Sequence, residues 1–144
     1  MTVDLQIAVE SPDSIVSSQR VEFWVNKTLK KIDHTENDLT VRLVEECEIQ
    51  QLNRDYRGKD KPTNVLSFPF EDVPEAEYEY LGDIIICMDV VRNESAQQDK
   101  DFESHFAHMV IHGTLHLCGY DHQSDEEAEV MEALEQTLLK EISL

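Results

Sequence analysis

Two short stretches of the chain alternate apolar and polar positions, which is the period of a strand with one buried face. Their apolar positions are Val3, Leu5, Ile7 and Val9 in the first, and Leu39, Val41 and Leu43 in the second. Residues 63–70 and 81–88 are rich in branched and aromatic side chains, which favours two further strands. The acidic stretch 71–80 between them contains Pro74 and is expected to be an exposed loop. The pattern therefore predicts four strands.

Apolar positions three and four residues apart predict helices in the rest of the chain. One helix covers about residues 17–32, and a short one around 49–56 ends where Gly58 can take a left-handed conformation. A short helix follows the fourth strand, and a longer one covers about residues 101–118. The last helix begins at the capping-box sequence 124–127. Its apolar stripe consists of Met131, Leu134, Leu138 and Ile142.

These elements predict a single α+β domain over residues 1–144, with a mixed sheet of about four strands covered by about five helices. The order of the strands does not follow from the pattern. The 144 residues are 40% hydrophobic and 30% charged, which is typical of globular proteins and unlike disordered or membrane proteins. The longest stretch without Asp, Glu, Lys or Arg, residues 106–120, is too short to cross a bilayer.

The three cysteines, Cys47, Cys87 and Cys118, are far apart in the sequence. No two of them make a Cys-x-x-Cys pair, so neither a disulfide framework nor a cysteine-based zinc site is predicted. Cys118 is expected to belong to the core. The first residues lack the basic and apolar segments of a secretory signal. These features predict a reducing, cytoplasmic location.

Four histidines of the helix predicted at 101–118 share a sector of about 80° on one face: His105, His108, His112 and His116. His112 and His116 are one turn apart, so their imidazoles can converge on one ion. Gly119 permits a left-handed turn, after which His122 can return as a third ligand. Three nitrogens leave a fourth position open on Zn²⁺, where a bound water has a pKa of about 7. The spacing therefore predicts a catalytic metal site.

Three polar residues near this motif have other expected roles. His105 and His108 lie two turns and one turn upstream of His112, and we expect them to pack or to contact the ligands rather than to bind metal. Asp121 is expected to orient a ligand through that ligand's second nitrogen, although it could also act as a base.

The histidine spacing equals that of the metzincin metallopeptidases, H-E-x-x-H-x-x-G-x-x-H, so the predicted fold contains a metzincin-like histidine helix. Gly113 stands where those enzymes have the Glu that acts as general base. Loss of a proton acceptor typically costs about 10²–10⁴-fold in rate, which disfavours peptide hydrolysis. A metallopeptidase-like hydrolase that uses Asp121 as its base is one alternative.

The segment 112–122, HGTLHLCGYDH, resembles the signature of the YbeY-type endoribonucleases, the rRNA maturation factors. Residues 53–70 and 81–84 resemble two further blocks of that family. The resemblance covers roughly residues 50–135. Asn64 is a departure, because many relatives have Asp at this position; its expected role is to close a turn.

The resemblance implies a single-domain, metal-dependent hydrolase that cleaves single-stranded RNA. The family acts in maturation of small-subunit rRNA and in ribosome quality control, and it binds zinc through three histidines. Its ligands would be His112, His116 and His122, and its functional arginine would be Arg57. The catalytic candidates are thus Arg57 and His112.

Physical reasoning supports Arg57, since a guanidinium can pair with two oxygens of a phosphodiester that gains charge during hydrolysis. Either a metal-bound water or the 2′-hydroxyl of RNA could attack the phosphate. Three imidazoles also suit Ni²⁺ or Co²⁺. A second alternative is a non-catalytic ribosome assembly factor in which the metal has only a structural role and holds the end of the helix in place.

Charge limits the partners. Twelve Lys and Arg against 31 Asp and Glu give a net charge of −19, unlike the basic surface of a general nucleic-acid binder. Residues 54–61 are an exception, with four basic and two acidic side chains. Residues 124–144 carry seven acids, expected to form a solvated helix face or to dock a basic partner. Together with the resemblance, this charge predicts a guided nuclease that a basic ribosomal protein or factor delivers to its RNA. The expected partners are single-stranded RNA or rRNA and the small ribosomal subunit or a basic ribosomal protein, with no membrane and no DNA.

Overall fold

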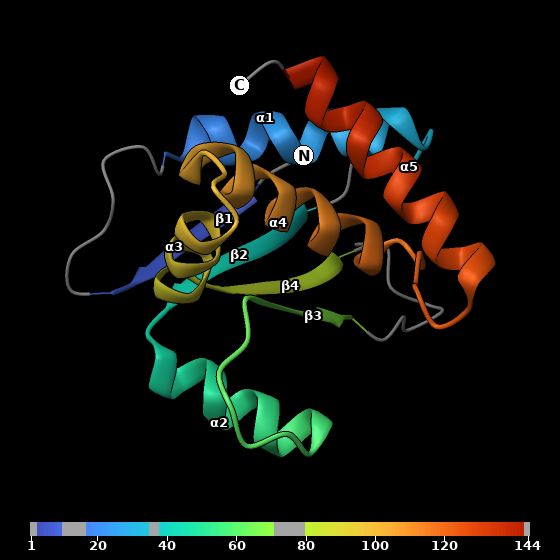
Figure 1. Ribbon diagram of the computed structural model, residues 1–144. Coiled ribbons are helices and arrows are strands. Elements are labelled where there is room, and N and C mark those ends of the chain that lie inside the picture. Colours follow the sequence, from blue (N-terminus) through green and yellow to red (C-terminus); the bar gives the residue numbers. More distant parts are fainter. Residues whose placement is uncertain (1–2, 10–16, 35–37, 71–79, 143–144) are drawn as a thin grey trace.

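The computed structural model describes residues 3–9, 17–34, 38–70 and 80–142. Within these ranges four strands form one mixed sheet in the order β1-β2-β4-β3 (Figure 1). The strands are β1 (Val3–Ala8), β2 (Asp38–Val44), β3 (Val65–Pro69) and β4 (Tyr80–Cys87). β1 and β4 each pair with β2 in parallel, and β3 pairs with β4 in the antiparallel direction. The predicted mixed sheet is therefore confirmed.

The predicted loop at 71–80 was wrong at its last residue. Tyr80 begins β4, where its hydroxyl donates a 2.6 Å hydrogen bond to Asp83 Oδ1 and also contacts the Thr40 hydroxyl on β2. These contacts tie Tyr80 to the sheet rather than to the loop. The remainder of that loop, residues 71–79, lies outside the described residues. The first strand, predicted to reach Val9, ends at Ala8.

All five predicted helices occur among the described residues. They are α1 (Ser18–Lys31), α2 (Glu46–Arg57), α3 (Met88–Gln97), α4 (Phe102–Leu117) and α5 (Asp125–Ile142). The predicted left-handed end of α2 is confirmed by a φ of 69° at Gly58. Half of the predicted capping box is observed: Ser124 Oγ accepts the backbone N–H of Glu127 at 3.2 Å, and the Glu127 carboxylate accepts from the Ser124 hydroxyl at 3.1 Å. In the part of the chain that is described, no helix is sufficiently long and apolar to cross a membrane.

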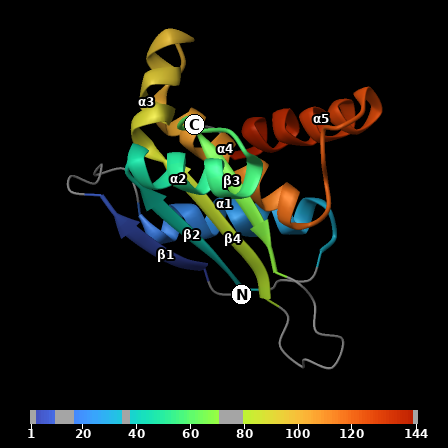
Figure 2. The ribbon, with the colours of Figure 1, turned by 90° about the horizontal axis from the view of Figure 1, so that it is seen from below.

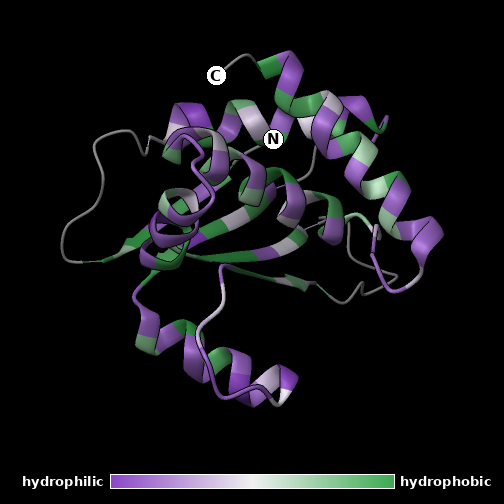
Figure 3. Ribbon diagram, in the orientation of Figure 1, coloured by the Kyte–Doolittle hydropathy of each residue, from purple (hydrophilic) through white to green (hydrophobic). Residues whose placement is uncertain are grey.

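Both faces of the sheet are covered (Figures 1 and 2). Helices α1 and α4 pack on one face, with α5 against both helices, and α2 lies on the opposite face. In β4, Ile84 and Ile86 join the larger core beneath α1 and α4, whereas Ile85 and Cys87 join the smaller core beside α2. Successive side chains of a strand point to opposite faces, so residues 84–87 of β4 are apolar on both faces. This explains the continuous apolar run of β4. Figure 3 colours the ribbon by the hydropathy of each residue.

Helix α4 approaches the sheet closely at Gly113. A Cβ atom at this position would lie 2.7 Å from Ile84 Cγ2 on β4, well inside van der Waals contact. The backbone oxygen of Gly113 also accepts a 3.3 Å hydrogen bond from the Ser67 hydroxyl on β3. Glycine is therefore required here by packing, and it sets the height of α4 above the sheet.

We expect Gly113→Ala to lower the free energy of unfolding, because the added methyl group forces Ile84 or α4 to move. Overpacking of this kind costs about 1–3 kcal/mol, which outweighs the gain of up to about 1 kcal/mol in helix propensity. Urea denaturation measures the change. The double variant Gly113→Ala/Ile84→Ala should lose less free energy of unfolding than the sum of the losses in the two single variants. The reason is that Ile84→Ala removes the side chain that the new methyl group would meet. An increase in stability in Gly113→Ala would contradict the close approach.

Candidate metal centre

The end of α4 and the turn after it bring three histidines together. His112 and His116 are one turn apart on α4, and the chain then reverses through Gly119, whose φ is 96°. One ligand nitrogen from each of His112, His116 and His122 lies within 4.8 Å of the other two. The ring centroids are 4.6 Å apart for His112 and His116, and 5.1 Å apart for His116 and His122. These side chains could hold one metal ion.

The protonation state of His116 favours metal binding. Burial lowers the pKa of His116, and the neighbouring His112 and His122 lower it further. A neutral imidazole offers a lone pair, whereas a protonated one has none to offer. The crowding of three imidazoles therefore prepares His116 to accept a metal ion.

A buried carboxylate from α5 anchors the histidine face of α4. Glu135 is 4% exposed, and its Oε1 accepts hydrogen bonds from His112 Nδ1 at 2.8 Å and His108 Nε2 at 3.1 Å. Burial alone would raise the pKa of Glu135, but these hydrogen bonds outweigh it and hold the pKa at about 2. Because an ionised carboxylate only accepts hydrogen bonds, His112 carries its proton on Nδ1. Its Nε2 is left free to bind a ligand.

The sequence prediction for residues 124–144 was wrong at Glu135. The seven acids were expected to form a solvated face or a docking surface, yet Glu135 is buried against two histidines. A signal was present in the sequence. Glu135 lies about 40° around the helix from Met131 and about 20° from Ile142, so it borders the apolar stripe of the helix. An acid at the border of such a stripe needs a partner when it is buried.

Outside the group of three, the upstream histidines pair with acids. His105 is buried, and its Nε2 lies 3.0 Å from Glu94 Oε1 on α3. Asn64 Nδ2 donates to the same oxygen at 3.1 Å, and Asn64 Oδ1 accepts the backbone N–H of Val65 at 2.7 Å. Asn64 thus satisfies the first backbone N–H of β3 and links the start of β3 to α3. Glu94 was not predicted from the sequence as the partner of His105 and Asn64.

Asp121 contacts backbone rather than an imidazole. Its Oδ1 accepts the backbone N–H of His122 at 2.7 Å, which shapes the turn that carries the third histidine. No side-chain bond from Asp121 to a histidine ring occurs among the described residues. A base at position 113 is excluded by packing, since any side chain there would meet Ile84.

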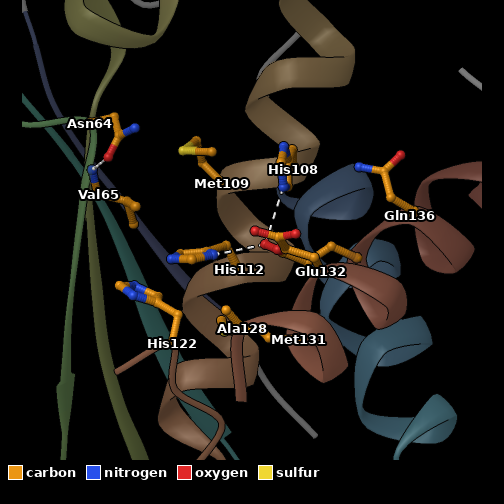
Figure 4. A pocket seen from close by; sticks show the side chains of 11 residues that line it. Asn64, Val65, His108, Met109, His112, His122, Ala128, Met131, Glu132 and Gln136 are labelled. Atoms are coloured by element: carbon orange, nitrogen blue, oxygen red, sulfur yellow. Dashed lines mark hydrogen bonds and ion pairs between the residues drawn. The ribbon is translucent and has the colours of Figure 1, made fainter. Parts of the chain in front are cut away.

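Arg57 and the three histidines line one cavity of about 800 Å³, formed by the ends of α2 and α4, β3 and the loop after α4. Arg57 is the last residue of α2 and is exposed. It makes no ion pair with the described residues, whereas Arg54 lies 3.5 Å from Asp55 Oδ1 and 4.0 Å from Asp60 Oδ1. A smaller cavity of about 360 Å³ adjoins His112 and His122, between Asn64 and α5 (Figure 4).

Comparisons with known proteins agree with this architecture. The chain is 30% identical to a Thermotoga maritima protein whose solution structure is known, with a TM-score of 0.66. The match covers 96% of this chain and 88% of that one. The family model described as endoribonuclease YbeY matches residues 6–143. The chain therefore belongs to the YbeY family of endoribonucleases, which act in rRNA maturation.

Proposed function

We propose that this endoribonuclease cleaves single-stranded RNA at a divalent metal ion held by His112, His116 and His122. The observation that carries the proposal is that three imidazole nitrogens lie within 4.8 Å of one another on a cavity that Arg57 also lines. Zn²⁺ is the proposed ion, and Ni²⁺ or Co²⁺ would also suit three imidazoles.

The donor set fits such an ion. Imidazole is a common zinc ligand, and the lowered pKa of His116 keeps that ring neutral. His112 would bind through Nε2, because its Nδ1 donates to Glu135. When bound, the ion would supply a Lewis acid and a position open to water or to a phosphate oxygen.

Arg57 is the proposed group that counters charge on the phosphate. A guanidinium can bind two phosphate oxygens at once, and this one lines the same cavity as the histidines without an ion pair to any described residue. Water or the 2′-hydroxyl of RNA would attack the phosphorus. The chemical ends of the cleaved RNA distinguish these two nucleophiles, since a 2′,3′-cyclic phosphate forms only when the 2′-hydroxyl attacks.

The proposed setting is small-subunit rRNA maturation and ribosome quality control in the cytoplasm. The net charge of −19 repels free RNA, so a basic ribosomal protein would bring the enzyme to its substrate. Apart from the buried Glu135 and from Glu141, which pairs with Lys31, the acids of α5 are exposed and available to such a partner. All three cysteines are free, which suits a reducing compartment.

The metal proposal predicts that His116→Ala and His122→Ala each lose the bound ion. Elemental analysis of tag-free protein should find about one divalent ion per chain in the wild type, and much less in either variant. His34→Ala, outside the cluster, should keep the wild-type content. Full metal content in both cluster variants would contradict the assignment.

Glu135→Gln should weaken metal binding, because the carboxylate fixes the orientation and tautomer of His112. Loss of such a partner typically lowers metal affinity about 10–100-fold. Competition with a chelating dye measures the affinity. The matched control is Glu132→Gln, an exposed acid on the same helix that also borders the smaller cavity. Equal affinities for the two variants would show that Glu135 does not position His112.

Arg57→Ala should lower kcat for RNA cleavage by about 10²–10³-fold, as expected when one group that stabilises transition-state charge is removed. The thermal transition should not change, because Arg57 is exposed. Arg54→Ala, one turn earlier on α2, is the control and should retain most activity. Unchanged rRNA processing in Arg57→Ala would favour the non-catalytic assembly factor. Cleavage of casein but not of RNA would favour the metallopeptidase that uses Asp121.

A further inference from the structure

An exposed aromatic ring stands at the edge of the cavity that holds the histidines. Tyr56 is 69% exposed, more than any other large apolar side chain in the described part of the chain. Its ring lies 5.0 Å from that of Phe68 on β3, at an interplanar angle of 63°. Both residues line the cavity of about 800 Å³. Single exposed apolar side chains are common, but this ring lines the candidate active site together with a second aromatic residue, which makes it a candidate contact for a ligand.

The backbone around Tyr56 is firmly held. Tyr56 lies in the last turn of α2, which ends at the left-handed residue Gly58. One turn earlier, Asn53 is 1% exposed, and its side chain donates a 2.9 Å hydrogen bond to the backbone oxygen of Lys61. Phe68 is fixed in β3, which pairs with β4. The backbone that carries the two rings is therefore held before any ligand arrives, and the Tyr56 ring already contacts Phe68, which reduces the entropy lost on binding.

The other walls of the cavity indicate what the ligand is. Arg57 follows Tyr56 in the chain, and His112 and His116 line the same cavity. Its volume is in the range of sites for drug-sized molecules and exceeds the needs of a phosphate group alone. An exposed aromatic face, a guanidinium and a set of imidazoles in one cavity match the base and the phosphate of a nucleotide.

The charge of the protein strengthens this inference. With a net charge of −19, the enzyme gains less from phosphate contacts than a basic nuclease does. The basic stretch 54–61 contains its own acids, and Arg54 pairs with two of them. Stacking of a base on an aromatic ring does not depend on net charge, so it can supply affinity that electrostatics does not.

We propose that the exposed ring of Tyr56, packed edge-to-face against Phe68, is a stacking platform for an unpaired RNA base beside the phosphate that is cleaved. The inference rests on the proposed function and adds the basis of its strand selectivity. A base within a duplex is stacked and paired, and it cannot reach the ring. The platform therefore selects single-stranded RNA.

Binding of an unstructured, fluorescently labelled RNA to the metal-loaded full-length protein tests the proposal. The RNA carries 2′-O-methyl groups to block internal attack, and a gel checks that it stays intact. We expect Tyr56→Leu and Tyr56→Ala to weaken binding about 5- to 100-fold, and Tyr56→Trp and Tyr56→Phe to retain it, since these keep an aromatic face. Binding of the same RNA annealed to its complement should be weak and alike in all variants.

The salt dependence of RNA affinity distinguishes the contribution of base stacking from that of phosphate contacts. The slope of log K against log salt should be unchanged in Tyr56→Leu, but smaller by about 0.7 in Arg57→Ala, which loses one phosphate contact. Phe23→Leu, another exposed aromatic on α1, is the control and should bind like the wild type.

Two results would overturn the platform. The first is wild-type affinity for single-stranded RNA in Tyr56→Leu. The second is loss of a copurifying protein from Tyr56→Leu with RNA affinity intact, which would make Tyr56 a protein-docking residue. The proposed function is tested separately, by cleavage of the unmodified RNA. If the wild type binds the RNA but does not cut it, the nuclease proposal fails while the platform stands.

Discussion

The main constraint on this structure is that α4 carries a row of polar histidines although most of the helix is buried in the core. Ten of the sixteen residues of α4 are buried, and Gly113 lets the helix rest directly on Ile84 of β4. Imidazoles placed on so buried a helix need hydrogen-bond partners, since an unpaired buried polar group is costly. Glu94 on α3 and Glu135 on α5 supply them. The packing of three helices is therefore set around one row of histidines.

This arrangement separates two kinds of chemistry along α4 and the turn that follows it. Upstream, His105 and His108 pair with carboxylates and tie α4 to its neighbours. Downstream, His116 and His122 face the larger cavity, with a lowered pKa at His116. His112 joins the two regions, because its Nδ1 contacts Glu135 while its ring lies in the group of three. A carboxylate that holds one nitrogen of an imidazole is the usual support for a metal ligand.

Much of the fold was predictable because local patterns determine it. The alternation in the β2 strand, the left-handed glycines after α2 and α4 and the Ser124 cap are all features of a few neighbouring residues. The approach of His122 to His112 and His116 was predictable for the same reason, since a single turn brings them together. Strand order was not, because it depends on contacts between segments far apart in sequence. Glu135 was missed because its partner histidines precede it by more than twenty residues, although its place beside an apolar stripe was visible.

The central claim is that three imidazoles on this cavity hold one divalent ion. X-ray absorption spectroscopy of the tag-free, metal-loaded protein tests it most directly, because nitrogen and sulfur ligands lie at different distances from zinc. The account predicts imidazole nitrogens and oxygens at about 2.0–2.1 Å, with no sulfur. A shell at about 2.3 Å would show a thiolate ligand such as Cys118, and would contradict a site built from His112, His116 and His122 alone.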